Sequence, residues 1–145
     1  MKSFLLFFTL LFGLYSSLTI NVGNCSELQN MTVNNSTIIY NITQNLVCNQ
    51  NFTMIGDQNS AFLGTIEGNF FNISGLRIIS ASSYVGIFAY GKSCGVRNLN
   101  FKNLTIDQTV KNNSASLFAF CENCNSKFFF FNFFSKHKKF IKFLL

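Results

Sequence analysis

The chain has 145 residues and a formal net charge of +6. That length fits one domain at most. Six of the cations lie near the two ends, and residues 18–126 carry five cations against five anions. The net positive charge therefore gives no support for nucleic-acid binding, which needs basic residues concentrated on one face.

Residues 1–17 have the pattern of a helical secretory signal peptide. Lys2 precedes an apolar run from Phe4 to Leu14, and small residues follow. The run is too short to span a bilayer comfortably. We expect cleavage near Ser16–Leu18 and a secreted or cell-surface protein. An uncleaved N-terminal anchor is the alternative.

The segment that follows is rich in Asn, Ser and Thr. Residues 18–45 are expected to form an N-terminal strand or cap segment, with a strand over 36–43, and Leu46–Met54 to supply part of an early rung. After a signal peptide, N-x-S/T sequons are candidate glycan acceptors. They begin at Asn24, Asn30, Asn34, Asn35, Asn41, Asn51, Asn72, Asn103 and Asn112. Asn also suits tight turns, so a structural role competes with glycosylation for these residues.

Residues 62–101 contain two copies of a short β unit. A shift of 23 positions places Gly68 on Gly91, with the further matches Ile73 on Val96, Leu76 on Leu99 and Ile78 on Phe101. A third copy at an offset of 30 places Phe88 on Phe118, Tyr90 on Phe120 and Cys94 on Cys124. Repeats of this length with variable polar insertions are typical of a solenoid.

The phrases FLGTIEGNFFNISGLRI and VGIFAYGKSCGVRNLNFKN resemble a known repeat family over roughly residues 46–124. They are similar to the GLUG-type and pectin-lyase-like right-handed parallel β-helix repeats of large secreted and surface proteins. The matching residues are Phe62, Gly64, Thr65, Glu67, Gly68, Asn69, Ile73, Leu76, Ile78, Val85, Gly86, Ile87, Phe88, Val96, Asn98, Leu99 and Phe101. The resemblance implies an all-β fold, a short right-handed parallel β-helix fragment of about three coils over residues 46–126. Such helices serve as adhesins, passive scaffolds and polysaccharide-cleaving enzymes, so the resemblance leaves the activity open.

The repeat pattern stops after Ser126, which stands where Val96 stood. Residues 127–145 are rich in Phe and Lys, and three interpretations are open. The tail is a membrane-associating amphipathic segment, an interrupted transmembrane start, or non-native translated sequence, which is the interpretation the composition favours. On the last interpretation the chain is a truncated fragment of a longer protein.

Five cysteines after a signal peptide favour disulfides. Cys25 and Cys48 are the expected pair, and Cys94 is expected to join Cys121 or Cys124, which leaves one cysteine over. A redox-active or zinc-binding role for the C-x-x-C at Cys121 is set aside. The chain has one histidine, His137, so a Ser-His-Asp triad or a His-based zinc site is not expected. We predict no catalytic residues, no metal site and no cofactor.

The acids inside the repeats are Asp57, Glu67 and Asp107. The resemblance places Glu67 in a turn of the repeat, so this residue is expected to hold the turn through side-chain to backbone hydrogen bonds. The repeated aromatic residues Phe88, Phe118, Tyr90 and Phe120 could stack sugars, but a structural aromatic ladder is the default interpretation.

The favoured function is a secreted or cell-surface, non-enzymatic β-helix protein with an adhesion, coat or scaffold role. The alternative is an N-terminal fragment of a carbohydrate-active β-helix enzyme, a polysaccharide lyase or hydrolase. A third hypothesis is a membrane-associated protein that acts through its Lys/Phe tail. The expected partner is an unidentified surface protein or glycan, with membrane contact through residues 127–145 and no nucleic acid.

Overall fold

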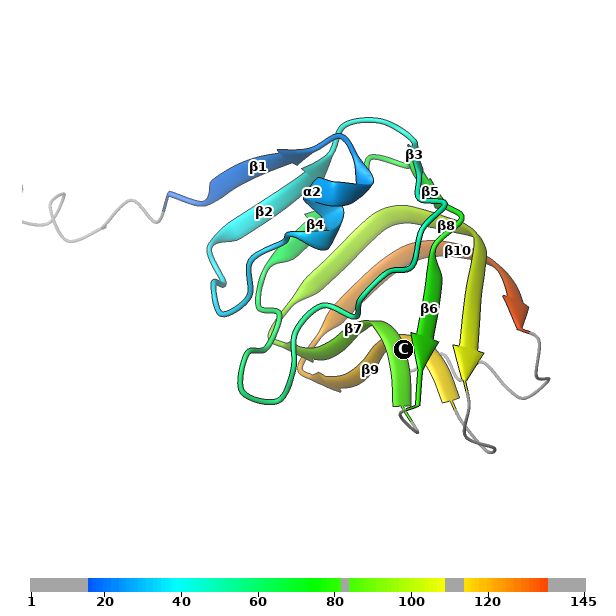
Figure 1. Cartoon of the computed structure of the whole chain (residues 1–145). Helices are drawn as coiled ribbons and strands as arrows, with labels where there is room; N and C mark the ends of the chain where they lie inside the picture. The colour runs from blue at the N-terminus through cyan, green and yellow to red at the C-terminus, as the bar shows by residue number, and fades with distance from the viewer. Residues whose placement is uncertain (1–15, 82–83, 109–113, 136–145) are drawn as a thin grey trace, which may run out of the picture.

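The computed structural model describes residues 16–81, 84–108 and 114–135, and the strands in these ranges pair in parallel. Eight strands share one sheet, in which β1, β2, β4, β8, β5 and β3 follow one another and β6 and β10 also pair with β8. The strands β7 and β9 form a second sheet (Figure 1). The elements in chain order are β1 (Leu18–Val22), α2 (Cys25–Gln29), β2 (Ile38–Ile42), β3 (Leu46–Val47), β4 (Thr65–Glu67), β5 (Asn72–Ser74), β6 (Arg77–Ser80), β7 (Tyr84–Lys92), β8 (Gly95–Gln108), β9 (Ser114–Glu122) and β10 (Asn125–Ser135).

The long strand β8 organises the larger sheet. Its three segments, 95–97, 100–102 and 105–108, pair with β4, β5 and β6 respectively. The segments are separated by Asn98 and Asn103, whose φ angles are 53° and 52°. Asn is one of the few residues that adopts this left-handed conformation readily, so each position can turn the strand. β10 pairs with β8 in parallel along most of its length.

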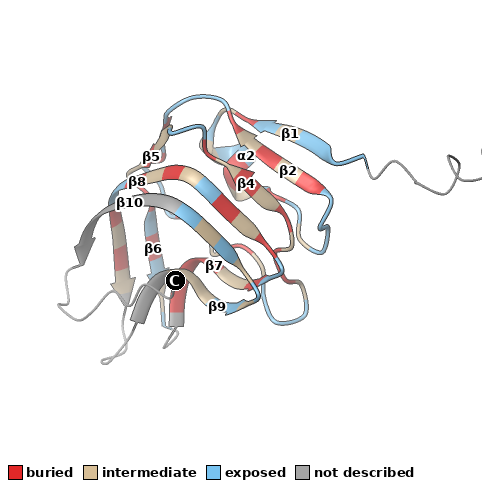
Figure 2. Cartoon of the chain, turned by 180° about the vertical axis from the view of Figure 1, so that it is seen from behind, coloured by how far each residue is buried: buried red, intermediate tan, exposed pale blue. Residues whose placement is uncertain are grey.

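The core consists of apolar residues at equivalent positions of neighbouring strands. Tyr40, Ile66 and Val96 are partners in successive strand pairs, and all three are buried. A second row joins Leu46, Ile73 and Phe101 in the same way. Figure 2 shows buried residues on each of the neighbouring strands β2, β4 and β8. Among the described residues no polar or charged side chain is buried, so the core is held by apolar contact.

The expectation of a short right-handed parallel β-helix is wrong. The structure is mainly parallel strands in a sheet, with one short helix in the described ranges, and it is not a closed solenoid. β7 and β9 pair with each other in a separate two-stranded sheet. The three-residue strands β4 and β5 and the two-residue strand β3 also leave much of the backbone outside the ladders.

The shift of 23 residues is also wrong as a structural register. Ile73 pairs with Phe101 instead of Val96, whose partner is Ile66. The two glycines that suggested the match have different surroundings. A Cβ on Gly68 would lie 2.6 Å from Leu99 Cα, whereas a Cβ on Gly91 would meet the ring of Phe118. The glycines were therefore selected by separate close contacts, and they do not mark one repeated turn.

The offset of 30 is confirmed for β7 and β9. Val85 pairs with Ala115, Phe88 with Phe118 and Tyr90 with Phe120. Ser126 lies opposite Val96, as the sequence predicts. β10 continues the parallel pairing to Ser135, so the boundary predicted after Ser126 falls inside this strand.

At the N-terminus, β2 lies within the strand predicted over residues 36–43, and β1 precedes it as its parallel partner. Between β1 and β2 lies α2, with Asn24 as its N-cap. The predicted signal peptide lies almost entirely outside the described residues, as does the tail after Ser135.

The close approach at Gly68 gives a direct test of the packing between the turn after β4 and the strand β8. Replacing Gly68 with Ala places a methyl group against Leu99 and the carbonyl of Asn98. We expect a loss of about 1–3 kcal/mol in the free energy of unfolding, the usual cost of overpacking, measured by urea denaturation of the oxidised protein.

Gly95→Ala is the matched control, because a Cβ there would lie 3.4 Å from the side chain of Thr65, an ordinary contact. That variant is expected to stay within about 0.5 kcal/mol of the parent protein. Equal losses in the two variants would contradict the observed packing.

Candidate functional site

A pair of stacked aromatic rings lies near the C-terminal ends of β7 and β9. Tyr90 and Phe120 are register partners, and their ring centroids lie 4.6 Å apart at an interplanar angle of 19°. Tyr90 is half-buried and Phe120 is 53% exposed. Neither belongs to the hydrophobic core cluster. Because Tyr90 covers one face of Phe120, the exposure of Phe120 comes from its other face and its edges.

The other two aromatic candidates belong to the core. Phe88 stacks on Phe118 with a centroid distance of 4.9 Å, and the row continues through Phe62 to Tyr40. Phe88 is buried, and Phe118 is partly buried against the core cluster. The sequence therefore predicts the pairing of all four aromatic residues, but the structure separates an inner pair, which packs the core, from an outer pair, which contacts solvent.

An ion pair lies two positions beyond the outer aromatic rings. Lys92 Nζ and Glu122 Oε1 are 3.2 Å apart, on register partners at the ends of β7 and β9. Both side chains are about half exposed, so the pair contributes little to stability. Its groups remain able to exchange hydrogen bonds with a ligand. We call Tyr90, Phe120, Lys92 and Glu122 the aromatic strip.

The other two acids inside the repeats, Asp57 and Asp107, are held by local partners. Asp57 accepts hydrogen bonds from the backbone amides of Asn59 and Ser60, within its own turn. Asp107 forms an ion pair with Arg77 of the neighbouring strand β6. Each carboxylate thus has a structural partner. The described residues contain no group of three His, Cys, Asp or Glu side chains that could hold a metal ion.

Glu67 sits at the centre of a polar cluster at the end of β4. Its Oε2 accepts a hydrogen bond from Arg97 Nε at 2.6 Å, and its Oε1 accepts from Asn98 Nδ2 at 2.9 Å and from the Asn69 amide at 3.2 Å. Burial by itself raises the pKa of Glu67, but hydrogen bonds from Asn98, Asn69 and Arg97 outweigh it and hold the pKa below the ordinary value. The carboxylate is therefore ionised at neutral pH and serves as an acceptor, in agreement with the predicted structural role.

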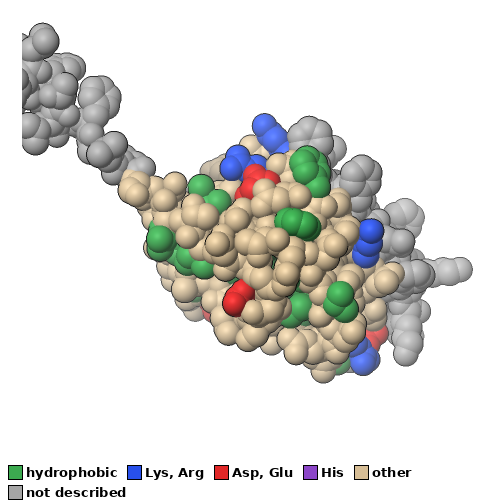
Figure 3. Space-filling view, turned by 90° about the horizontal axis from the view of Figure 1, so that it is seen from above, with side chains coloured by type: hydrophobic (Ala, Val, Ile, Leu, Met, Phe, Trp, Pro, Cys, Tyr) green, Lys and Arg blue, Asp and Glu red, His purple; other side chains and the backbone are tan. Residues whose placement is uncertain are grey.

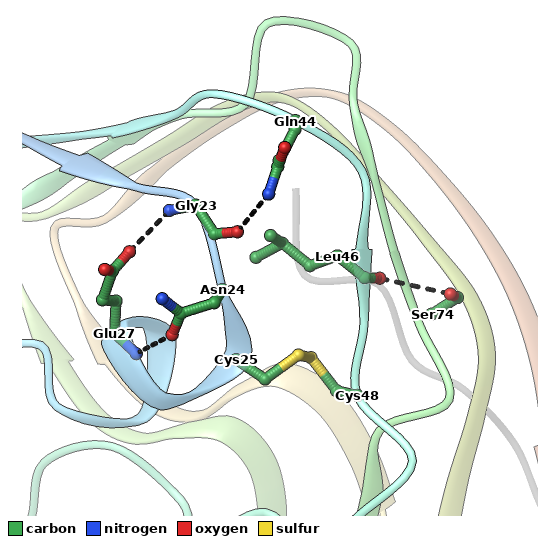
Figure 4. Close-up of a disulfide and its surroundings, with 8 residues drawn as sticks. All are labelled: Gly23, Asn24, Cys25, Glu27, Gln44, Leu46, Cys48 and Ser74. Atoms are coloured by element: carbon green, nitrogen blue, oxygen red, sulfur yellow. Dashed lines mark hydrogen bonds between the residues drawn. A yellow bond between two sulfur atoms is a disulfide. The ribbon is translucent and has the colours of Figure 1, made fainter.

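The structure joins Cys25 to Cys48, as predicted, with a Cα–Cα distance of 5.5 Å. Figure 4 shows that this disulfide ties α2 to the segment after β3. Near it, Glu27 and the N-cap Asn24 satisfy the first turn of the helix: Asn24 Oδ1 accepts from the Glu27 amide, and Glu27 Oε2 accepts from the Gly23 amide. The disulfide and the cap fix the loop between β1 and β2.

The second predicted pairing differs from the structure. Cys121 is joined to Cys124 instead of either joining Cys94, and Cys94 is a buried free cysteine. The predicted stacking of Cys94 with Cys124 is nevertheless present, since their sulfur atoms lie 3.1 Å apart. The strand register therefore brings Cys94, Cys121 and Cys124 together. The sequence predicts a disulfide between two of them, with the third left unpaired.

The sequon asparagines fall into two groups. In one group the side-chain nitrogen that would carry a glycan is hydrogen-bonded within the protein, and in the other the residue is exposed to solvent. The Nδ2 atoms of Asn41 and Asn72 donate hydrogen bonds to Asn21 and Asn45 at 2.9 and 3.0 Å. Both of these side chains are half-buried. Six sequon asparagines are exposed, and Asn112 lies outside the described residues; the exposed ones are Asn24, Asn30, Asn34, Asn35, Asn51 and Asn103.

A pocket of about 370 Å³ lies beside β1 and α2. Its lining includes Asn24, Glu27 and Asn30, together with Tyr40, whose hydroxyl lies 2.6 Å from Thr32 Oγ1. Two of the exposed sequons therefore border the pocket. It contains no grouping of side chains that specifies a reaction.

The described part of the chain contains no helix long and apolar enough to cross a membrane. His137 and the end of the Lys/Phe tail lie outside it. On the face shown in Figure 3, charged side chains are few and exposed hydrophobic side chains are scattered instead of forming one patch.

Comparisons with protein-family models, with curated proteins and with solved structures found no match to this chain.

Sequence reasoning did not find the Lys92–Glu122 ion pair or the division of the aromatic residues. The ion pair follows from the same offset of 30, because positions 92 and 122 lie between the aligned pairs Tyr90–Phe120 and Cys94–Cys124. Strand periodicity could not predict the division, because Phe88 and Tyr90 are two positions apart and a regular strand would place them on one face. Phe88 belongs to the core because it packs against Phe62 of a distant segment, which the alignment does not show.

The cluster at Glu67 predicts a pH-dependent contribution to stability. Because the folded-state pKa lies below the ordinary value, the stabilisation is present above the unfolded pKa near 4.5 and is lost as the pH falls through the folded pKa. Glu67→Gln is expected to lower the free energy of unfolding by about 1–2 kcal/mol at pH 7, with a smaller difference from the parent at pH 3. Urea denaturation at the two pH values measures both quantities.

Glu122→Gln is the control, because Glu122 also pairs with a cation but on an exposed surface. We expect a change of less than about 1 kcal/mol at pH 7. Equal effects of the two substitutions, or a Glu67→Gln effect that does not change with pH, would contradict the role assigned to Glu67.

Proposed function

We propose that this chain is a secreted or cell-surface protein with a non-enzymatic adhesion or scaffold role, and that the aromatic strip is its contact surface for a glycan. The observation that carries the proposal is the exposure of Phe120 while it is stacked on Tyr90. The Phe120 ring is held on one face by Tyr90, and its other face contacts solvent. Such a ring offers a ligand a rigid apolar face at little cost in conformational entropy.

The chemistry of the strip suits a sugar. The open face of Phe120 can pack against the C–H face of a pyranose ring, while Lys92 and Glu122 supply a donor and an acceptor for hydroxyl groups. The two rings form a small apolar surface beside polar groups. This combination resembles a carbohydrate contact more than the extended apolar core of a stable protein interface.

The proposed location rests on separate observations. The disulfide between Cys25 and Cys48 is of a kind that persists in oxidising compartments. The residues at the N-terminus have the composition of a signal peptide, and exposed sequons lie on the folded surface. Together these features favour passage through the secretory pathway.

Binding is tested by exposing the full-length secreted protein to a panel of immobilised polysaccharides and glycans. Phe120→Ala is expected to weaken binding to the recognised glycan at least tenfold, about 1.4 kcal/mol, because it removes the exposed ring face. Tyr90→Ala is expected to act in the same direction by removing the support behind that ring.

Phe70→Ala is the matched control, because Phe70 is 68% exposed but lies in the turn after β4, where its backbone amide bonds to Asn98 of β8, and not on β7 or β9. It should bind like the parent protein. Equal weakening by Phe70→Ala and Phe120→Ala, or retention of binding by Phe120→Ala, would exclude the strip as the glycan contact. Binding to none of the glycans would contradict the proposed ligand class.

Secretion and glycosylation are tested by expressing the whole chain in eukaryotic cells. We expect the protein in the medium, a mass decrease on treatment with peptide-N-glycosidase, and retention inside the cell when residues 1–17 are removed. Among single Asn→Gln variants, those at the exposed Asn51 and Asn103 should each remove a glycan, whereas those at Asn41 and Asn72 should leave the glycan mass unchanged. Retention of the full chain inside the cell would contradict secretion. Glycans found only at Asn41 and Asn72 would contradict the division of the sequons into exposed sites that accept a glycan and half-buried sites that do not.

A further inference from the structure

Three cysteines meet where the turn after β7 contacts the turn after β9. Cys94 and Cys124 follow residues with the same left-handed conformation, Ser93 at a φ of 47° and Asn123 at a φ of 55°. Two backbone hydrogen bonds hold the turns in register, from Ser93 N to Glu122 O at 2.8 Å and from Asn125 N to Cys94 O at 2.9 Å. The sulfur of Cys94 consequently lies 3.1 Å from that of Cys124.

The free thiol is the most buried of the three sulfur positions. Cys94 is 4% exposed, Cys124 is half-buried, and Cys121 is exposed at the end of β9. The lack of a side chain at Gly91 makes room for this arrangement, because a Cβ there would lie 2.9 Å from Cys94 Sγ. Cys94 therefore faces a disulfide whose far sulfur belongs to an exposed residue.

We propose that Cys94, Cys121 and Cys124 form an internal thiol–disulfide exchange site that can transfer the free thiol from Cys94 to Cys121. The Cys94 thiol gives its proton to solvent, and its thiolate attacks Cys124 Sγ. A Cys94–Cys124 bond forms as the Cys121–Cys124 bond breaks. The electron pair leaves on Cys121, which then takes up a proton, so no external oxidant or reductant is needed.

The surroundings set the rate and the direction of this exchange. Burial raises the pKa of Cys94 to about 11, although backbone hydrogen bonds at Cys94 and Lys92 act the other way. The charged residues at the ends of the two strands, Lys92 and Glu122, pair with each other. Little thiolate is present at neutral pH, so the step is slow. Its product places the disulfide in the buried position and the thiol where water can solvate it.

The exchange would convert an inert buried thiol into an accessible one. In the starting state, a reagent in solvent meets no free thiol on the surface formed by these three cysteines. After exchange, Cys121 is reachable by a disulfide-containing or thiol-reactive molecule. The site is thus a candidate for covalent modification, and it does not depend on the glycan contact proposed above.

The test uses the full-length oxidised protein, incubated at pH 7 and at pH 9 with iodoacetamide and without reductant. After acid quenching, cleavage by trypsin and a glutamyl endopeptidase separates the three cysteines, because Lys92, Arg97, Glu122 and Lys127 lie between and around them. We expect alkylated Cys121 together with peptide 93–97 joined to peptide 123–127. Below the pKa of Cys94, the rate should rise about tenfold per pH unit.

Two variants provide controls. Cys94→Ser removes the attacking thiol, so Cys121 should remain unlabelled at both pH values. In Cys121→Ser, oxidised glutathione supplied during folding takes up the two electrons released when the Cys94 and Cys124 thiols form a disulfide, so peptide 93–97 should be joined to peptide 123–127 without alkylation.

The proposal is overturned if the wild-type protein shows no labelled Cys121 and no joined peptides at pH 9, with Cys94 labelled only after unfolding. It is also overturned if Cys94→Ser is labelled at Cys121 as fast as the wild type. The wild-type measurement decides the matter by itself if a variant does not fold.

Discussion

The parallel pairing of β8 with its neighbours is the interaction on which the rest of the structure depends. Asn98 and Asn103 take left-handed conformations and divide the strand into segments that meet β4, β5 and β6 in turn. Parallel pairing sets equivalent residues side by side, so apolar side chains join apolar ones and polar side chains join polar ones. The buried row through Ile66 and Val96, and the ion pair between Glu67 and Arg97 beside it, are two results of one register.

The same principle produces both candidate sites, although they lie on the second sheet. Pairing of β7 with β9 places Phe120 on Tyr90 and Glu122 beside Lys92, and the turns that follow bring Cys124 to Cys94. A one-residue slip of this pair would separate all three contacts and turn the side chains of the shifted strand to the opposite face. The proposed glycan contact and the proposed sulfur exchange are chemically independent, but they share this geometric cause.

Sequence reasoning found the register where long similar phrases align, and it failed where only short patterns match. VGIFAY against ASLFAF identifies the β7–β9 pairing, because several large side chains coincide. The match of Gly68 to Gly91 gave a wrong register, because a glycine can be required by a local close contact as well as by a repeated turn. The β-helix expectation failed at the level of how the strands connect into sheets, which local periodicity does not encode. The free Cys94 could not be predicted either, because three sulfur atoms within reach of one another allow more than one pairing.

The most direct test of this account is the strand register, measured by nuclear Overhauser effects between side chains of the oxidised protein in solution. The structure predicts contacts between Ile66 and Val96, between Ile73 and Phe101, and between the rings of Tyr90 and Phe120. A contact between Ile73 and Val96, with none between Ile66 and Val96, would show the shift of 23 residues instead. That result would contradict the account of the larger sheet, and the absence of a contact between the rings of Tyr90 and Phe120 would contradict the β7–β9 register and remove the basis of the two sites.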